Sequence, residues 1–348
     1  MTSNMHRGSL VLLLALTPIL CGVDRAAAQL PELRSGEVVP RDIREMYERG
    51  LKYLALQQSP EGGWQGSQGG PGVDGLCVMC FLACGEDPNY GIYADNVQKG
   101  VQAVLRAQNK STGYYGNSMY HHGFAMLAMA EAYGAVDDRQ WSGHGEQLPS
   151  IGASLELAVR SAVTSQKKNQ LGAWRYSPDS NDADTSVSGA VLVGLLAARN
   201  AGIEVPDESI DRAIAYYKSM TSDSGQVAYA GMGGFDNSPA RISIGSLVYA
   251  IARRKDIPQY EATVRNLSEN LEAPANGYTE YTRYYRAQAL FQGDYEAWQK
   301  WNRLLVRTLK ESQNPDGSFQ GDFGPELGTS MSLLSLALNY RFLPIYER

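Results

Sequence analysis

Clusters of one charge sign and histidines are both scarce in this chain. Its 348 residues contain 31 Lys and Arg against 37 Asp and Glu, a formal net charge of -6, and only four His. No stretch gathers basic residues as a phosphate-binding face would, which argues against nucleic acid as a partner. Four histidines also leave few ligands for zinc. We therefore expect no metal site and no cofactor.

Long apolar runs are missing as well. The longest, Leu10 to Leu20, has about eleven residues, whereas a membrane-spanning helix needs about twenty. Weakly basic residues precede this run, and Ala26-Ala27-Ala28 follows it as a small-residue cleavage site. We expect residues 1–28 to be a signal peptide, 29–40 a linker and 41–348 one repeat domain. The mature protein would then be secreted or periplasmic, without a transmembrane segment.

Cysteine is rare, and three of the four residues stand together beyond the signal peptide. Cys77, Cys80 and Cys84 are spaced i, i+3, i+7, which places them along one face of a helix. Neighbours on a regular helix seldom meet the geometry of a disulfide. We expect small buried residues that pack against an adjacent helix. Oxidation, or metal binding together with His121 and His122, stays open as an alternative.

A glycine-rich turn that carries one aromatic residue occurs six times. An amphipathic helix precedes each turn, and a helix of small and apolar residues follows it. Successive aromatics are 41 to 60 residues apart, which suits two helices and two loops per repeat. The turns are Gly62-Gly63-Trp64, Gly113-Tyr114-Tyr115, Gly172-Ala173-Trp174, Gln226-Val227-Ala228-Tyr229, Asn276-Gly277-Tyr278 and Asp316-Gly317-Ser318-Phe319.

A glutamine precedes four of these turns. Gln58, Gln108 and Gln313 lie six residues before Trp64, Tyr114 and Phe319, and Gln166 lies eight before Trp174. A glutamine at a helix end can bridge backbone groups of a neighbouring turn, while the aromatic ring packs over the turn. We expect each glutamine to be structural.

The two helices of each repeat differ in polarity. The first helices carry the charges, and we expect them at 42–57, 93–108, 155–166, 208–220, 259–271 and 295–313. The second helices, such as 119–133, 187–199 and 330–339, are rich in Ala, Gly, Ser and Leu. A helix that is apolar all round must be buried, and a helix with a polar face can cover a surface. The sequence thus predicts an all-α fold, an α/α toroid of six helical hairpins with an inner and an outer ring.

The repeat resembles that of the squalene cyclases, oxidosqualene cyclases and protein prenyltransferase β subunits, whose signature is Q-x-x-x-G-x-W. The resemblance covers roughly residues 41–348. It is most specific in Gln58-Ser-Pro-Glu-Gly-Gly-Trp64, in Gln313-Asn-Pro-Asp-Gly-Ser-Phe319 and in Gly172-Ala-Trp-Arg-Tyr176. The resemblance implies the toroid, but repeats of this kind do not fix an activity.

The cyclases of this family carry an Asp-x-Asp-Asp motif that protonates an alkene or epoxide. Here the matching place reads Asp182-Ala183-Asp184-Thr185, so the third carboxylate is replaced by Thr185. The resemblance implies Asp184 as proton donor and Asp182 as its helper. Because an apolar helix begins directly afterwards, the structural interpretation is that one of Asp182, Asp184, Thr185 and Ser186 is the N-cap of that helix. The zinc motif of the prenyltransferases, Asp-x-Cys, does not occur, and neither does the Gly-Cys-Gly-Glu-Gln of complement-type thioester proteins.

The first residues of the inner helices should surround one mouth of the barrel. The expected ligand-binding residues are Tyr120, His121, His122, Arg241, Tyr281, Arg283 and Tyr284. They combine charge with aromatic rings, which favours a binding module that takes a small-molecule, lipid, glycan or protein ligand in a central cavity. One alternative is a terpenoid cyclase-like enzyme that uses Asp184. Another is a polysaccharide-acting enzyme, although no carboxylate pair stands out for that chemistry.

Overall fold

The computed structural model describes residues 39–66, 69–139, 141, 148–231, 234–275 and 277–347. The predicted signal peptide, most of the linker and Asn276 of the fifth turn lie outside these residues. Within them the chain forms twelve α-helices and one short 3-10 helix, and extended pairing is limited to an isolated bridge between Thr221 and Val227. The prediction of an all-α fold is confirmed.

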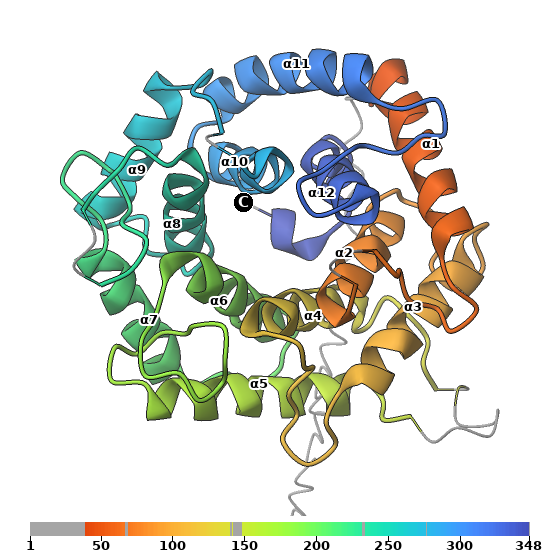
Figure 1. Cartoon of the computed structure of the whole chain (residues 1–348), viewed down its shortest axis with the longest axis horizontal. Helices are drawn as coiled ribbons and strands as arrows, with labels where there is room; N and C mark the ends of the chain where they lie inside the picture. The colour runs from red at the N-terminus through yellow and green to blue at the C-terminus, as the bar shows by residue number, and fades with distance from the viewer. Residues whose placement is uncertain are drawn as a thin grey trace, which may run out of the picture. The chain divides into compact units, whose positions relative to one another are not determined.

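The twelve helices form two concentric rings (Figure 1). The outer ring consists of α1 (Arg41–Gln57), α3 (Ala94–Ala107), α5 (Ile151–Lys168), α7 (Asp207–Ser219), α9 (Pro258–Glu269) and α11 (Tyr295–Ser312). The inner ring consists of α2 (Pro71–Leu82), α4 (Met119–Ala132), α6 (Thr185–Asn200), α8 (Pro239–Ile251), α10 (Thr279–Gly293) and α12 (Pro325–Ala337). Each inner helix packs against the next, and α12 packs against α2, so the ring closes. The predicted α/α toroid is confirmed.

The polarity of each helix explains whether it belongs to the inner or the outer ring. Every residue of α2 is buried, whereas α1 buries only one face. Small residues let the inner helices approach closely: a Cβ on Gly123 of α4 would lie 2.5 Å from the carbonyl carbon of Ala190 on α6. Glycine is therefore needed at this crossing, since a larger residue would force the two backbones apart.

The glutamines connect consecutive repeats. In each case the Nε2 group donates to the carbonyl of its own turn glycine and to a carbonyl of the next outer helix, at 2.7–2.9 Å. The paired acceptors are Gly62 and Asn96 for Gln58, Gly113 and Ser154 for Gln108, Gly172 and Ser209 for Gln166, and Gly317 and Met46 for Gln313. The contact between Gln313 and Met46 joins the sixth repeat to the first. The predicted structural role of these glutamines is confirmed.

In five of the turns, the residue two positions after a glycine with positive φ is buried. These residues are Trp64, Tyr115, Trp174, Val227 and Phe319, each at most 2% exposed. In the second and fourth turns the sequence pointed to Tyr114 and Tyr229 as the packed aromatic, and this was wrong. The buried turn residue is therefore at a constant distance in sequence from the glycine, whose positive φ fixes the turn, and not from the glutamine.

Side chains from the inner helices hold these turns in place. The backbone N–H groups of Trp64, Tyr115, Trp174 and Phe319 donate to Asp74, His122, Ser188 and Thr329, respectively, at 2.7–3.2 Å. Four different residue types thus satisfy the same buried donor in four repeats.

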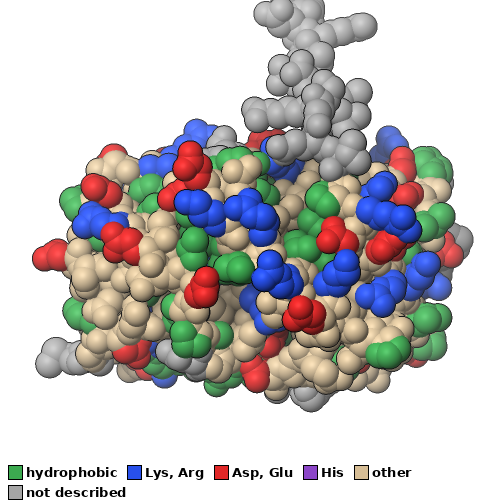
Figure 2. Space-filling view, turned by 90° about the horizontal axis from the view of Figure 1, so that it is seen from above, with side chains coloured by type: hydrophobic (Ala, Val, Ile, Leu, Met, Phe, Trp, Pro, Cys, Tyr) green, Lys and Arg blue, Asp and Glu red, His purple; other side chains and the backbone are tan. Residues whose placement is uncertain are grey.

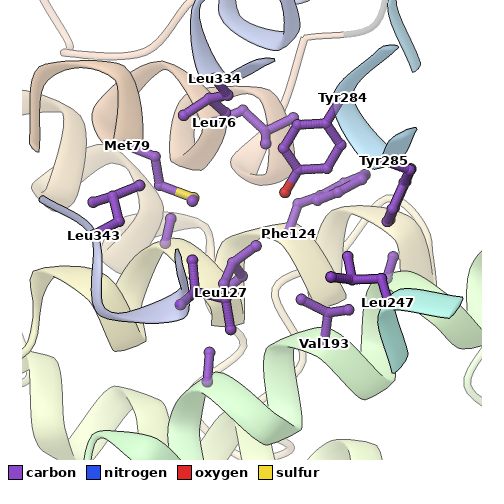
Figure 3. Packing of buried hydrophobic residues seen from close by; sticks show 14 of the residues in the cluster. Leu76, Met79, Phe124, Leu127, Val193, Leu247, Tyr284, Tyr285, Leu334 and Leu343 are labelled. Atoms are coloured by element: carbon purple, nitrogen blue, oxygen red, sulfur yellow. The ribbon is translucent and has the colours of Figure 1, made fainter. Parts of the chain in front are cut away.

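Packed side chains occupy the space that the inner helices enclose. Figure 3 shows residues of all six inner helices and Leu343 pointing toward one another. Aromatic contacts run through this core, with ring centroids 6.2 Å apart for Phe124 and Tyr284 and 4.9 Å apart for Tyr284 and Tyr285. The centre of the ring is therefore a hydrophobic core at this level.

Residues near the end of the chain lie inside the ring (Figure 1), where they contact the carboxyl-terminal parts of α4, α10 and α12. We call residues 343–347 the C-terminal plug; it contains the short 3-10 helix Pro344–Tyr346. Leu343, Ile345 and Tyr346 are each 3% exposed. The Ile345 N–H donates to the buried carboxyl of Glu131, whose pKa burial raises to about 8. The plug therefore covers the carboxyl ends of the inner helices and not their amino-terminal ends.

The flank of the ring carries interspersed acidic and basic side chains (Figure 2). This distribution agrees with the absence of clustered charge in the sequence. Within the described residues no helix is long and apolar enough to cross a membrane.

Candidate functional site

A group of tyrosines and arginines gathers at the amino-terminal ends of α4, α6, α8 and α10. We call it the tyrosine mouth; its members are Tyr120, Arg175, Tyr176, Asp184, Tyr229, Arg241 and Tyr281. Tyr176 is 47% exposed, and Tyr229 is partly buried. The group combines aromatic faces, phenol hydroxyls and charges of both signs at one end of the ring.

Two arginine side chains contact the aromatic rings of Tyr176 and Tyr229. Arg175 lies 5.5 Å from the ring centroid of Tyr176 and 5.4 Å from that of Tyr229, and the two hydroxyls are 3.0 Å apart. Arg241 lies 5.8 Å from the Tyr229 ring. All three guanidinium-to-ring distances are within the range of attraction between a cation and an aromatic face. The two rings are thus held in fixed positions before any ligand binds.

Two further tyrosines extend this surface. The Tyr120 ring is 5.9 Å from Tyr176, and its hydroxyl is 3.5 Å from that of Tyr281. Tyr120 and Tyr281 lie in the first turns of α4 and α10. Because these two helices stand on opposite sides of the inner ring, the contact spans the ring. Aromatic surface therefore crosses the mouth.

The repeat itself positions Tyr176 and Tyr229. They follow the buried turn residues Trp174 and Val227 by two, so they are equivalent positions of the third and fourth repeats. The carbonyl of Tyr176 accepts from the Met119 N–H, and that of Tyr229 accepts from the Thr185 N–H. In both cases the turn is attached to the first residue of the preceding inner helix.

Asp184 is the N-cap of α6 and is fully buried. Its Oδ1 accepts the Val187 N–H at 2.7 Å, whereas its Oδ2 makes no hydrogen bond and lies 3.6 Å from Nε of Arg175. Burial raises the pKa of this carboxyl, and the Val187 N–H and Arg175 oppose the rise. Asp182 is exposed and also lies 3.6 Å from Nε of Arg175. Arg175 therefore stands between both aspartates, and Asp184 fills the capping role that the sequence allowed.

The structure places His122 and Tyr284 away from the mouth. His122 is fully buried, and its ring nitrogens contact the Tyr115 N–H and the Ala158 carbonyl, which leaves neither for a ligand. Burial lowers the pKa of His122 to about 4. Tyr284 is 1% exposed and packs in the core. Both side chains lie in the interior because they face other helices and not the amino-terminal end of the ring.

The remaining expected residues fall into three settings. Tyr120, Arg241 and Tyr281 lie together in the tyrosine mouth beside Asp184. His121 sits between α2 and α4, where its Nδ1 accepts the Gly72 N–H at 3.2 Å. Arg283 is half-buried on α10, on a different side of that helix from Tyr281. The sequence did not single out Arg175, Tyr176 or Tyr229 as site residues, and their signal was the constant spacing from the turn glycine.

The three cysteines are free, and burial raises their pKa values. In the part of the chain that the structure describes, no three His, Cys, Asp or Glu side chains are grouped as a metal site. A surface hollow of about 500 Å³ lies beside the first turn. Asp74, one of two carboxylic residues that line the hollow, accepts the Trp64 N–H, and burial raises the pKa of Asp74 to about 6.

Comparison with known proteins finds similarity of fold. No family model matches the sequence, and no curated protein does. An inactive α-1,6-mannanase variant from Salegentibacter, in complex with α-1,6-mannotriose, is 10% identical with a TM-score of 0.61, covering 85% of this chain and 99% of the other. A variant of the type II terpene cyclase MstE from Scytonema, in complex with geranylgeranyl dihydroxybenzoate, is 15% identical with a TM-score of 0.59, covering 87% and 98%. A family 76 glycoside hydrolase from Bacteroides thetaiotaomicron is 11% identical with a TM-score of 0.59, covering 86% and 78%.

These identities establish a shared α/α toroid and nothing finer. The fold class of the chain is therefore that of the toroid proteins, whose solved members include both terpene cyclases and glycoside hydrolases.

Proposed function

We propose that this chain is a binding module that holds a carbohydrate at the tyrosine mouth after export. The observation that carries the proposal is the set of tyrosine rings that Arg175 and Arg241 hold in place at the open end of the ring. Tyrosine offers a large amphipathic contact surface with little loss of side-chain entropy. Its ring can cover an apolar sugar face, while its hydroxyl bonds a sugar hydroxyl.

Two features favour a polar ligand over a hydrocarbon. The centre of the ring is filled by packed side chains, and the accessible residues carry hydroxyls and charges. Binding is favoured over glycoside hydrolysis because Asp182 and Asp184 both lie against Arg175, instead of facing each other across an open space. The Salegentibacter mannanase, bound to a mannotriose, supports a sugar ligand on this fold.

Alanine variants of Tyr176 and Tyr229 test the proposal. Each substitution is expected to weaken binding of an oligosaccharide that the wild type binds by about tenfold, since one aromatic contact contributes about 1 kcal/mol or more. The measurement is isothermal titration calorimetry over a panel of soluble oligosaccharides. Tyr90→Ala is the matched control, because Tyr90 is 88% exposed in the loop after the carboxyl end of α2. Wild-type protein that binds no member of the panel, or variants that bind as the wild type does, would refute the proposal.

A second candidate is an isoprenoid cyclase-like reaction started by Asp184. It is favoured by the buried Oδ2 atom of Asp184, which has no hydrogen-bond partner, and by the raised pKa of that carboxyl. A carboxylic acid that stays protonated in a dry site can donate its proton to a substrate.

For this candidate, wild-type protein incubated with a linear polyene such as geranylgeranyl dihydroxybenzoate should yield a cyclic isomer of equal mass. Asp184→Asn should abolish the product, since the amide keeps the capping oxygen but lacks the acidic proton. Mass-resolved chromatography of the extract checks both. Unchanged substrate with the wild type, or equal turnover by Asp184→Asn, removes this candidate.

A further inference from the structure

The fifth turn departs from the pattern that the other turns follow. In those turns the residue two positions after the glycine is buried, but Thr279, which follows Gly277 by two, is exposed. The aromatic residue of this turn, Tyr278, is 56% exposed as well. The fifth repeat therefore keeps an aromatic ring on the surface, where it adds nothing to the core.

A second aromatic ring holds Tyr278 in place. Tyr278 stacks on Phe323, which lies in the loop before α12, with the ring centroids 5.3 Å apart and the ring planes at 4°. The backbone of Tyr278 is left-handed, with φ at 52° and ψ at 55°, a conformation that costs free energy for any residue other than glycine. Strain of this kind persists where the surrounding structure imposes it, and it is concentrated at functional sites.

Hydrogen bonds connect the two segments that carry these rings. The Thr279 N–H donates to the Asp322 carboxylate at 3.2 Å, and the Asp322 N–H donates to Oε1 of Glu280 at 2.8 Å. Glu280 is 3% exposed, so the second bond is shielded from water. A ligand would therefore meet the stacked pair, Tyr278 and Phe323, without the cost of ordering either segment. We call this pair the aromatic platform.

The aromatic platform lies at the same end of the ring as the tyrosine mouth. Tyr278 and Phe323 precede α10 and α12, two neighbouring inner helices whose amino-terminal ends share one end of the ring with those of α4, α6 and α8. Tyr281 of the mouth follows Tyr278 by three residues, a spacing that makes two residues neighbours on a helix surface. The Tyr281 ring in turn lies 6.3 Å from that of Tyr120 across the ring of helices. Aromatic residues thus continue from the mouth toward the platform.

Two aromatic surfaces at one end of the ring suit a chain of repeated units. One exposed ring covers the apolar face of one sugar. When two such surfaces engage the same chain, the second contact forms intramolecularly, so the chain binds more tightly than it would to either surface alone. A monosaccharide could occupy only one of them.

We propose that the aromatic platform is a second carbohydrate-binding surface, so that the ligand of this protein is a linear oligosaccharide chain that extends from the tyrosine mouth to Tyr278 and Phe323. The inference rests on the proposed carbohydrate function and specifies its ligand as a chain of several units. The platform then determines how strongly affinity increases with the length of that chain.

The test measures affinity against chain length. Isothermal titration calorimetry is carried out with soluble manno-, gluco- and xylo-oligosaccharides of two to six units. In at least one series, wild-type protein is expected to bind the hexasaccharide about tenfold or more tightly than the disaccharide. Tyr278→Ala and Phe323→Ala should each weaken hexasaccharide binding by about tenfold and leave disaccharide binding unchanged. Tyr278→Phe keeps the stacked ring and should retain the preference for longer chains, as should the control Tyr90→Ala.

The outcomes separate this inference from the proposed function. If the wild type binds hexasaccharide and disaccharide equally in every series that it binds, the role of the platform is overturned and the carbohydrate function stands. A preference for longer chains that survives in both alanine variants, or an equal loss for short and long chains, also overturns the role of the platform. Binding of no member of any series overturns the carbohydrate function and this inference together. Circular dichroism checks that each variant is folded.

Discussion

Replacing Gly113 by alanine is expected to lower the free energy of unfolding by about 3–5 kcal/mol, since backbone strain and forced displacement add. Gly113 has a φ of +76°, and a Cβ there would lie 2.2 Å from the carbonyl oxygen of Leu157 in α5. That oxygen belongs to the backbone of the next outer helix, so it cannot move aside as a side chain could. The substitution therefore separates the second repeat from the third.

Gly116→Ala is the matched control. Gly116 also has a positive φ, +87°, but nothing lies within 4 Å of a Cβ at this position. Its replacement is expected to cost only the backbone strain, about 1–2 kcal/mol. Urea unfolding of the two variants and the wild type, followed by circular dichroism, gives the comparison. Equal losses in the two variants would show that contact with α5 is not what requires glycine at position 113.

Ending the chain at Phe342 is expected to destabilise the protein by about 5–8 kcal/mol. The deletion removes Leu343, Ile345 and Tyr346, which are each 3% exposed, and burial of one such side chain contributes about 1.5–3 kcal/mol. A loss of this size is comparable with the whole stability of many domains. We expect loss of cooperative thermal unfolding, measured by calorimetry.

A chain that ends at Tyr346 is the control, because it keeps the three apolar side chains and loses the contact of Gln292 with the Glu347 carbonyl. It should lose about 1 kcal/mol. A synthetic peptide of residues 343–348 added to the longer deletion should restore part of the thermal transition. An unchanged transition temperature after deletion to Phe342 would contradict the importance of the plug.

The sequence was sufficient for the toroid because the fold is repetitive. Six periodic turns and two classes of helix leave few other arrangements, and the glutamine contacts follow from their place at helix ends. Which residue of each turn fills the buried position was harder to predict. Tyr229 was interpreted as a turn aromatic, yet Val227 fills that position and Tyr229 is free to join the mouth. Only the distance from the turn glycine separates the two roles.

The site was predicted in part. Tyr120, Asp184, Arg241 and Tyr281 do gather at one end of the ring, because inner helices start there. His122 does not join them, since it satisfies the same backbone donor that Asp74, Ser188 and Thr329 satisfy elsewhere. Four unlike residues in one role give no sequence signal. The plug had none either, because a short apolar tail resembles any surface-covering segment.

The bond between Gln313 and the Met46 carbonyl has a consequence for how such a protein can change over evolutionary time. An open array of repeats can lengthen or shorten by whole units, because its two ends are never required to meet. Here a glutamine of the sixth unit bonds the first unit, as glutamines of the first three units bond their successors, so the closed ring has no free end to which a further unit could be added. Repeat proteins usually acquire new binding surface by duplicating a unit at one end, and a closed ring offers no such end. Diversification must instead come from single substitutions at positions that the turns leave unused, such as the second residue after each buried turn position.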